Sequence, residues 1–199
     1  MKITDIKQQI RQEGRYSIFV DGVYAFSLRA ESLLAAQYAV GQTLSSAELA
    51  EAKRQAETDK AYALTLAYIA RRMRSEGELL DYFRRKGYPD EFGRTVLPKL
   101  RKLGLVDDWE FARRWIDNRR MLRSSSTQRL RLELRQKKVS DDIIAALLSE
   151  GKTDDCEMLR MLIAKKRKQT RYQDDQKLIA YLARQGFSYG DIKAVMAVD

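Results

Sequence analysis

Four pairs of adjacent aspartates are the residues of this sequence best suited to metal chemistry. They stand at positions 107–108, 141–142, 154–155 and 174–175. Two carboxylates side by side can hold Mg²⁺ for phosphoryl transfer, the chemistry of a two-metal nuclease. Each pair also stands at a predicted helix start, where aspartate caps free amide groups and meets the positive end of the helix dipole. We favour capping, and a Mg²⁺-dependent nuclease that uses Asp107 and Asp108 is the weakest of our hypotheses.

The sequence lacks the other common catalytic groups. It contains no histidine, which removes the commonest general base and most zinc sites. Its single cysteine, Cys156, rules out an intramolecular disulfide, and no glycine-rich phosphate loop is present. We therefore expect a protein that is not an enzyme and that needs no cofactor.

Clusters of lysine and arginine are the second chemical feature, and they favour the binding of a polyanion. The chain has 38 basic and 28 acidic residues, a net charge of +10. Residues 1–59 carry 7 basic and 8 acidic groups, whereas residues 60–199 carry 31 and 20, so the whole excess lies in the second part. Such a balance attracts nucleic acid or acidic protein surfaces. The residues that we expect to make the contact are Arg71, Arg72, Arg74, Arg113, Arg120, Arg123, Arg129, Arg131, Lys165, Lys166, Arg167 and Lys168.

A β-hairpin next to a helix is predicted for the N-terminal part. Residues 16–28 form two runs rich in β-branched and aromatic residues around Asp21-Gly22, a dipeptide that favours a type I′ turn. A hairpin alone is marginally stable, so we expect it to pack on a helix at about 30–38 or to pair with a third strand near 2–8. The segment from Ser45 to Glu48 is a capping box that opens a long alanine-rich helix.

An internal repeat of about 50 residues organises the rest of the chain. The segments that begin at Leu79, Leu130 and Leu178 align with one another, and each belongs to a unit of three short amphipathic helices. No unit buries its apolar face alone, so we predict a mainly α fold of tandem three-helix repeats that form an elongated, curved rod. The predicted divisions are a β-hairpin module at 1–44, the start of a linking helix at 45–59, and repeats at 60–105, 106–151 and 152–199.

The basic clusters recur at the C-terminal ends of the first and second helices of each repeat. Cations there complement the helix dipole, so solvated helix ends explain any one cluster. Stacked repeats superimpose these ends into one stripe, and the set as a whole therefore favours a polyanion track. Arg119 and Lys166 lie near the edge of the apolar stripe, where both an internal aspartate and a ligand are open as partners.

Several motifs occur in an order that is typical of one family. The segments 71–88, 103–115 and 129–138 resemble the RecX family of RecA regulators, most closely over about 68–150, and the hairpin resembles the N-terminal extension of part of that family. The resemblance implies a bacterial, non-catalytic, negative regulator that binds the RecA filament on single-stranded DNA and lies in its groove. It further implies inhibition of filament extension, ATP hydrolysis, strand exchange and co-protease activity, with a role in recombination, DNA repair and the SOS response.

The sequence departs from the family pattern at two places. Where the family usually has Pro-Gly after the arginine motif, this chain reads Ser124-Ser-Ser126-Thr127, and we expect Ser126 or Thr127 to cap the next helix. Where the family usually repeats Lys-Gly, it reads Lys137-Lys138. A residue other than glycine costs about 1 kcal/mol there if its φ is positive.

The partners expected from this resemblance are the RecA filament and single-stranded DNA, with double-stranded DNA as a further candidate. The alternative is a sequence-independent DNA-binding module that acts without RecA, whose affinity for DNA would fall steeply with salt. The N-terminus has no apolar signal-peptide core, and no segment approaches the roughly 20 apolar residues of a membrane span. We therefore expect a cytoplasmic monomer with no membrane partner.

Overall fold

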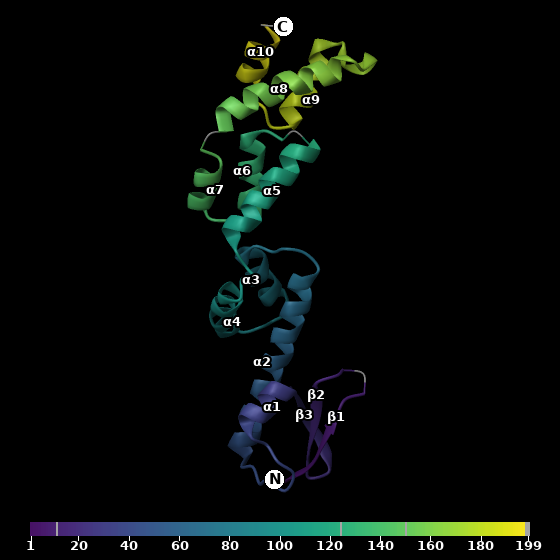
Figure 1. Cartoon of the computed structure of the whole chain (residues 1–199), viewed down its shortest axis with the longest axis vertical. Coiled ribbons are helices and arrows are strands. Elements are labelled where there is room, and N and C mark those ends of the chain that lie inside the picture. Colours follow the sequence, from purple (N-terminus) through teal and green to yellow (C-terminus); the bar gives the residue numbers. More distant parts are fainter. Residues whose placement is uncertain (11, 124, 150, 198–199) are drawn as a thin grey trace. The chain divides into compact units, whose positions relative to one another are not determined.

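A small sheet followed by a series of helices makes up the chain (Figure 1). The computed structural model describes residues 1–10, 12–123, 125–149 and 151–197, and of residues 123 and 151–154 it describes only the backbone. The chain divides into two compact units, Met1–Arg72 with Tyr88–Val96, and Met73–Gly87 with Leu97–Asp199. The predicted fold class, mainly α with a small N-terminal β module, is confirmed.

Three antiparallel strands form the sheet in the order β1 (Ile3–Gln8), β2 (Arg15–Val20) and β3 (Val23–Arg29). Asp21 and Gly22 connect β2 to β3 with φ values of 50° and 81°, both positive as a type I′ turn requires. Both expected partners of the hairpin are present, because β1 pairs with β2 and α1 (Ala30–Ala36) follows β3 directly.

One face of this sheet carries the core of the first unit. Side chains alternate between the two faces of a strand, so the buried Ile18, Phe26 and Leu28 lie on the same side. They pack with Ala52 and Ala56 of helix α2 (Ser46–Ala70), and α1 lies on one side of the sheet (Figure 1). The sheet therefore has a core face and an outer face.

The predicted capping box begins α2. The Ser45 hydroxyl accepts a hydrogen bond from the Glu48 amide at 3.2 Å, and the Glu48 carboxylate accepts one from the Ser45 amide at 2.7 Å. Further along α2, the Asp59 carboxylate accepts hydrogen bonds from the Arg29 amide at 3.1 Å and from the Ser32 hydroxyl at 2.8 Å. These two bonds fasten the start of α1 to α2.

Helices make up the remainder of the chain. They are α3 (Glu76–Arg85), α4 (Asp90–Lys102), α5 (Asp108–Arg123), α6 (Thr127–Gln136), α7 (Asp141–Leu147), α8 (Gly151–Arg167), the 3₁₀ helix η1 (Thr170–Tyr172), α9 (Asp175–Arg184) and α10 (Tyr189–Met196). Helices α5 to α7 enclose one core around Leu130 and Leu134, and α8 to α10 enclose another around Leu178 and Leu182. Among the described residues, no helix combines the length and the apolar character that crossing a membrane requires.

The turns that end the second helices have the expected backbone. Gly87, Lys138 and Gly186 follow α3, α6 and α9, with φ values of 70°, 59° and 92°. Lys138 thus takes the left-handed conformation that favours glycine, and the local cost of about 1 kcal/mol applies.

Candidate nucleic-acid interface

Two joints connect successive repeats through the ends of their second helices. In the first joint, the hydroxyl of Ser75, which caps α3, donates a hydrogen bond to the Lys137 carbonyl at the end of α6. In the second, the amide of Ser126, which caps α6, donates to the Gln185 carbonyl at the end of α9 at 3.3 Å. Ser126 is therefore the residue that caps α6. At both joints, the start of a second helix lies against the end of the second helix of the following repeat.

The second aspartate of two pairs fastens the same joints. Asp108 of α5 accepts a hydrogen bond from the Glu76 amide at 2.8 Å, and Asp155 of α8 accepts one from the Thr127 amide at 2.9 Å. Burial raises the pKa of both carboxyls above the ordinary aspartate value, against the hydrogen bonds that lower it. Each of these aspartates caps the second helix of the preceding repeat instead of its own helix.

The other aspartates divide between capping and ion pairing. Asp107 and Asp174 cap their own helices, as predicted, by accepting hydrogen bonds at 3.0 Å from the amides three residues later. Asp141 pairs instead with Arg135 at 2.7 Å. Helix α8 begins at Gly151, so the pair at 154–155 lies in its first turns and not directly at its first residue, and the side chain of residue 154 lies outside the described part.

The aspartate pairs form no metal centre in the part of the chain that the structure describes. No three acidic, histidine or cysteine side chains converge there as metal ligands would. Both carboxylates of the 107–108 pair are occupied by backbone amides of helix starts. Nothing in their geometry supports the nuclease hypothesis.

The Glu133 carboxylate of α6 accepts hydrogen bonds from three side chains of the middle repeat. It accepts hydrogen bonds from the Trp115 indole at 2.9 Å, from Arg119 at 2.7 Å and from Arg129 at 3.3 Å. Burial raises the pKa of Glu133, but these three donors together bring it below the ordinary value. Arg119, which also lies 4.7 Å from the centre of the Trp115 ring, therefore has an internal partner, a glutamate instead of an aspartate.

Four of the predicted contact residues are held by neighbours within the chain. Arg113 pairs with Glu110 at 2.9 Å, and Arg167 pairs with Asp175. Lys166 lies 4.6 Å from the centre of the Tyr181 ring and 5.2 Å from that of Tyr172. Arg129, besides its bond to Glu133, donates to the Arg184 carbonyl. A ligand that binds these side chains has to compete with the partners they already have.

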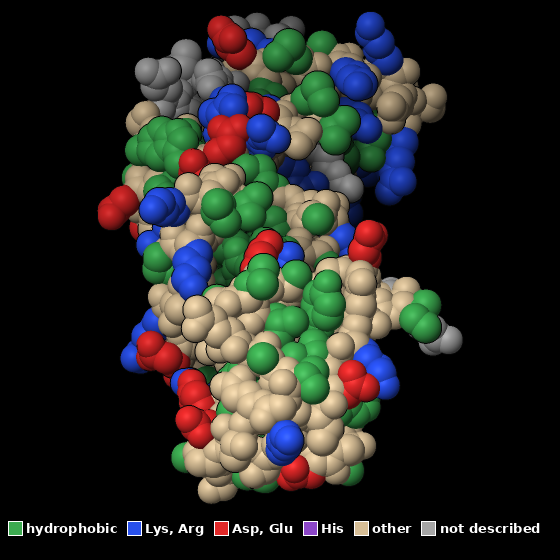
Figure 2. All heavy atoms as spheres, turned by 60° about the horizontal axis from the view of Figure 1, so that its bottom comes forward, with side chains coloured by type: hydrophobic (Ala, Val, Ile, Leu, Met, Phe, Trp, Pro, Cys, Tyr) green, Lys and Arg blue, Asp and Glu red, His purple; other side chains and the backbone are tan. Residues whose placement is uncertain are grey.

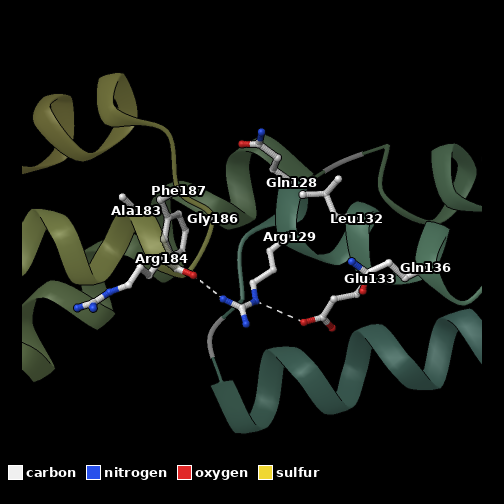
Figure 3. Close-up of a pocket in the computed structure, with 9 residues that line it drawn as sticks. All are labelled: Gln128, Arg129, Leu132, Glu133, Gln136, Ala183, Arg184, Gly186 and Phe187. Atoms are coloured by element: carbon white, nitrogen blue, oxygen red, sulfur yellow. Dashed lines mark hydrogen bonds and ion pairs between the residues drawn. The ribbon is translucent and has the colours of Figure 1, made fainter.

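Arg129 also lines a groove between α6 and α9 (Figure 3). The groove has a volume of about 460 Å³, and Phe187 and the exposed Leu132 are among the residues that line it. Arg184, which borders it, belongs to no basic cluster of the sequence and for that reason was not predicted.

Other predicted contact residues point to solvent. Arg71, Arg131, Lys165 and Lys168 are exposed, and among the described residues none of these four has an ion-pair partner. Lys165 lies in the last turn of α8, and Lys168 follows the last residue of this helix. On the face drawn in Figure 2, Lys and Arg side chains are more numerous over the helical repeats than over the sheet module.

The last four predicted residues differ in exposure. Arg72 is exposed, whereas Arg74 and Arg120 are half-buried, and the charge of Arg120 acts on Asp155 by lowering its pKa. The side chain of Arg123 lies outside the described part of the chain. Three of the twelve residues thus follow α2 in the chain, and the other nine lie in α5, α6 and α8 or directly after α8.

Family models match four successive parts of the chain. The RecX N-terminal domain matches residues 1–45, and the first, second and third three-helix domains of RecX match residues 61–100, 107–148 and 153–196. The predicted three-helix repeats are therefore confirmed.

Curated relatives and solved structures agree with the family models. Regulatory protein RecX of Mycobacterium avium (strain 104) is 35% identical over 138 residues, which cover 65% of this chain and 79% of that protein. Regulatory protein RecX of Bacillus licheniformis is 28% identical and covers 98% of this chain and 76% of its own. A crystal structure of regulatory protein RecX matches with a TM-score of 0.76 and 27% identity over 98% of both chains.

A second solved structure supports the fold alone. The crystal structure of RecX from Lactobacillus salivarius has a TM-score of 0.60 and 21% identity, and the match covers 70% of this chain and 94% of that one. Together with the four domain matches, which follow the chain in order, these similarities have one explanation: this chain belongs to the RecX family of regulatory proteins.

Proposed function

We propose that this chain is a non-catalytic negative regulator of RecA. It binds the filament of RecA on single-stranded DNA, lies in the filament groove, and inhibits filament extension, ATP hydrolysis, strand exchange and co-protease activity. It acts as a cytoplasmic monomer without a cofactor. Membership of a family of regulatory proteins supports this role. The net charge of +11 in residues 60–199, from 31 basic and 20 acidic groups, supports contact with a polyanion.

The observation that carries the proposal is the set of exposed cations without internal partners. Arg131 and Lys165 stand on different helices of the repeats, and neither forms an ion pair with a described residue. A cation that is already paired, such as Arg113, gains less from a phosphate because it first loses its carboxylate. We therefore assign the main contacts to Arg131, Lys165 and Lys168, with Arg71 as a further one.

Hydrolysis of ATP by RecA in the presence of single-stranded DNA tests this assignment. The wild-type chain, added far below the RecA concentration, should suppress hydrolysis. The double variant Arg131→Glu/Lys165→Glu should lose this effect, because two favourable phosphate contacts become repulsive. The matched control is Lys53→Glu/Lys60→Glu, which changes the net charge equally at exposed lysines of α2. Urea unfolding of both variants verifies that each is folded.

Two outcomes would contradict the proposal. Inhibition by Arg131→Glu/Lys165→Glu at the wild-type level would show that these cations do not bind the filament. Inhibition by the wild-type chain only when it saturates the DNA would identify the alternative, a sequence-independent DNA-binding module that acts without RecA.

A further inference from the structure

The outer face of the N-terminal sheet carries aromatic rings and cations that the proposed function does not use. In the register of the strands, Phe19 stands opposite Tyr24, Lys7 opposite Ser17, and Arg15 opposite Arg29. Residues directly opposite each other project to the same face of a sheet. The core face holds Ile18, Phe26 and Leu28. The pairing of β2 with β3 shifts by one residue between Ile18 and Phe19, so Tyr24 leaves the face of Phe26 and stands with Phe19 on the outer face, as do the basic residues.

The two rings form a compact aromatic surface. Phe19 and Tyr24 meet edge to face, with ring centres 6.1 Å apart and an angle of 80° between the planes. Tyr24 is 54% exposed, and the Lys7 ammonium lies 5.5 Å from the centre of the Phe19 ring. An exposed ring on a sheet, with a lysine beside it, is suited to stacking against a nucleic-acid base.

The charge of the outer face is positive although the module as a whole is close to neutral. Lys7, Arg15 and Arg29 stand on this face together with Asp5, which is its one acid among the described strand residues and which pairs with Lys7 at 2.6 Å. Asp59 of α2 accepts a hydrogen bond from the Arg29 amide, but no described acid forms an ion pair with the Arg29 side chain. Three cations against one acid leave the outer face with a charge of about +2.

Arg15 adds an independent sign of an anionic ligand. Only 9% of this residue is exposed, and its guanidinium donates to the Ser27 hydroxyl at 2.9 Å and to the Ser27 carbonyl at 3.0 Å. None of the described carboxylates forms an ion pair with it. Buried arginines are normally paired with an acid, and because no described acid neutralises Arg15, its positive charge adds to the attraction of this face for phosphates.

We propose that the outer face binds single-stranded nucleic acid, with a base stacked on Tyr24 and the backbone phosphates drawn to Lys7, Arg15 and Arg29. An apolar protein surface would cover the rings but would offer no acid to Arg15 and Arg29, which form no ion pair with a described residue. This site goes beyond the proposed function, and it requires neither RecA nor the cations of the repeats.

Binding of a fluorescent oligothymidylate of about 12 nucleotides to the full chain tests the proposal without RecA. Tyr24→Ala should weaken binding roughly 5-fold to 150-fold, because one stacking contact is lost. Tyr24→Phe keeps the ring and should bind as the wild type does, and Val23→Ala, at the 70% exposed neighbour without a ring, is a second control. The salt dependence of the affinity should not change in Tyr24→Ala, since a tyrosine neutralises no phosphate.

The salt dependence separates this site from the proposed function. Arg131→Glu/Lys165→Glu removes phosphate contacts of the repeats and should reduce the slope of log affinity against log salt by about 0.7 for each contact. A Tyr24→Ala variant that has the wild-type urea midpoint and binds the oligothymidylate with wild-type affinity overturns the proposal. So does weaker inhibition of RecA with unchanged affinity for DNA, which would assign the outer face to a protein partner.

Crosslinking of the wild-type chain tests the proposal even if the variants do not fold. An oligonucleotide that carries 5-bromouracil, irradiated in the complex, should crosslink within residues 16–29, where Phe19 and Tyr24 stand. Crosslinks confined to the helical repeats would refute stacking on the sheet.

Discussion

Gly77 and Lys138 should depend on each other for the stability of the first joint. Gly77 is the second residue of α3 and is buried. A Cβ atom added to it would lie 2.2 Å from the Cβ atom of Lys138, far inside the contact distance of two carbon atoms. The position of the Lys138 Cβ is fixed by its backbone, whose φ is 59°, so no change of side-chain rotamer relieves the overlap.

The magnitude follows from two opposing effects. Overpacking at a buried contact costs about 1–3 kcal/mol of the free energy of unfolding. Alanine in place of glycine inside a helix stabilises by about 0.5–1 kcal/mol. Gly77→Ala should therefore destabilise the wild-type chain by about 1–2 kcal/mol. In the background of Lys138→Gly the overlap is absent, and the same substitution should stabilise the chain by about 0.5–1 kcal/mol.

A double-mutant cycle measured by urea unfolding gives the coupling between the two residues. Lys138→Gly alone should stay within about 1 kcal/mol of the wild type, because relief of the positive φ offsets the loss of the ion pair that Lys138 forms with Asp81. The expected coupling is about 2 kcal/mol, the difference between the two effects of Gly77→Ala. A coupling near zero, with Gly77→Ala equally destabilising in both backgrounds, would refute the contact as the reason why position 77 is glycine.

Two carboxylates should give opposite responses to pH. Asp155→Ala should cost about 1 kcal/mol by uncapping Thr127, whereas Asp155→Asn keeps an acceptor oxygen and should cost less; equal losses in urea unfolding would exclude capping. The folded pKa of Asp155 is raised above 3.8. The part of its contribution to the free energy of unfolding that depends on pH therefore stabilises the fold below that pH and is lost as the pH rises through the folded pKa. Glu133→Ala should cost roughly 2 kcal/mol, since Trp115 and Arg119 lose their acceptor. The folded pKa of Glu133 is lowered below 4.5, so its contribution is present above that pH and is lost as the pH falls through the folded pKa; Glu133→Gln should abolish this pH dependence, and an unchanged profile would contradict the assignment.

Elements with a local signal were predictable from the sequence. The capping box at Ser45 and the turn at Asp21-Gly22 depend on residues within a few positions, and the structure has both. The joints depend on contacts such as that from Ser75 to Lys137, which are 62 residues apart. No periodicity or cap indicates which helix end meets which helix start, so the role of Asp108 at the joint was not predictable.

Whether a predicted contact cation forms an ion pair within the chain follows in part from its spacing to acids along the same helix. Arg113 has Glu110 three residues before it, and Arg129 has Glu133 four residues after it, and both arginines pair with these acids. Arg131 has no acid three or four residues away on either side, and it remains exposed without an ion pair to a described residue. This spacing, applied to the basic clusters, would have separated paired cations from exposed ones. It fails for Arg167, which pairs with Asp175 beyond η1, because a turn of the chain brings them together.

The glycines of the two joints explain why lysine is tolerated at position 138, where the family usually has glycine. In the first joint the glycine is at the helix start, Gly77, and the turn residue is Lys138. In the second the glycine is in the turn, at Gly186, where a Cβ would lie 2.7 Å from the Arg129 Cβ and 2.5 Å from the Ser126 hydroxyl oxygen. Each joint thus has space for only one of the two Cβ atoms. A lysine at the turn is compatible with close packing when the opposing helix start is glycine, so the turns of the middle and last repeats are not interchangeable.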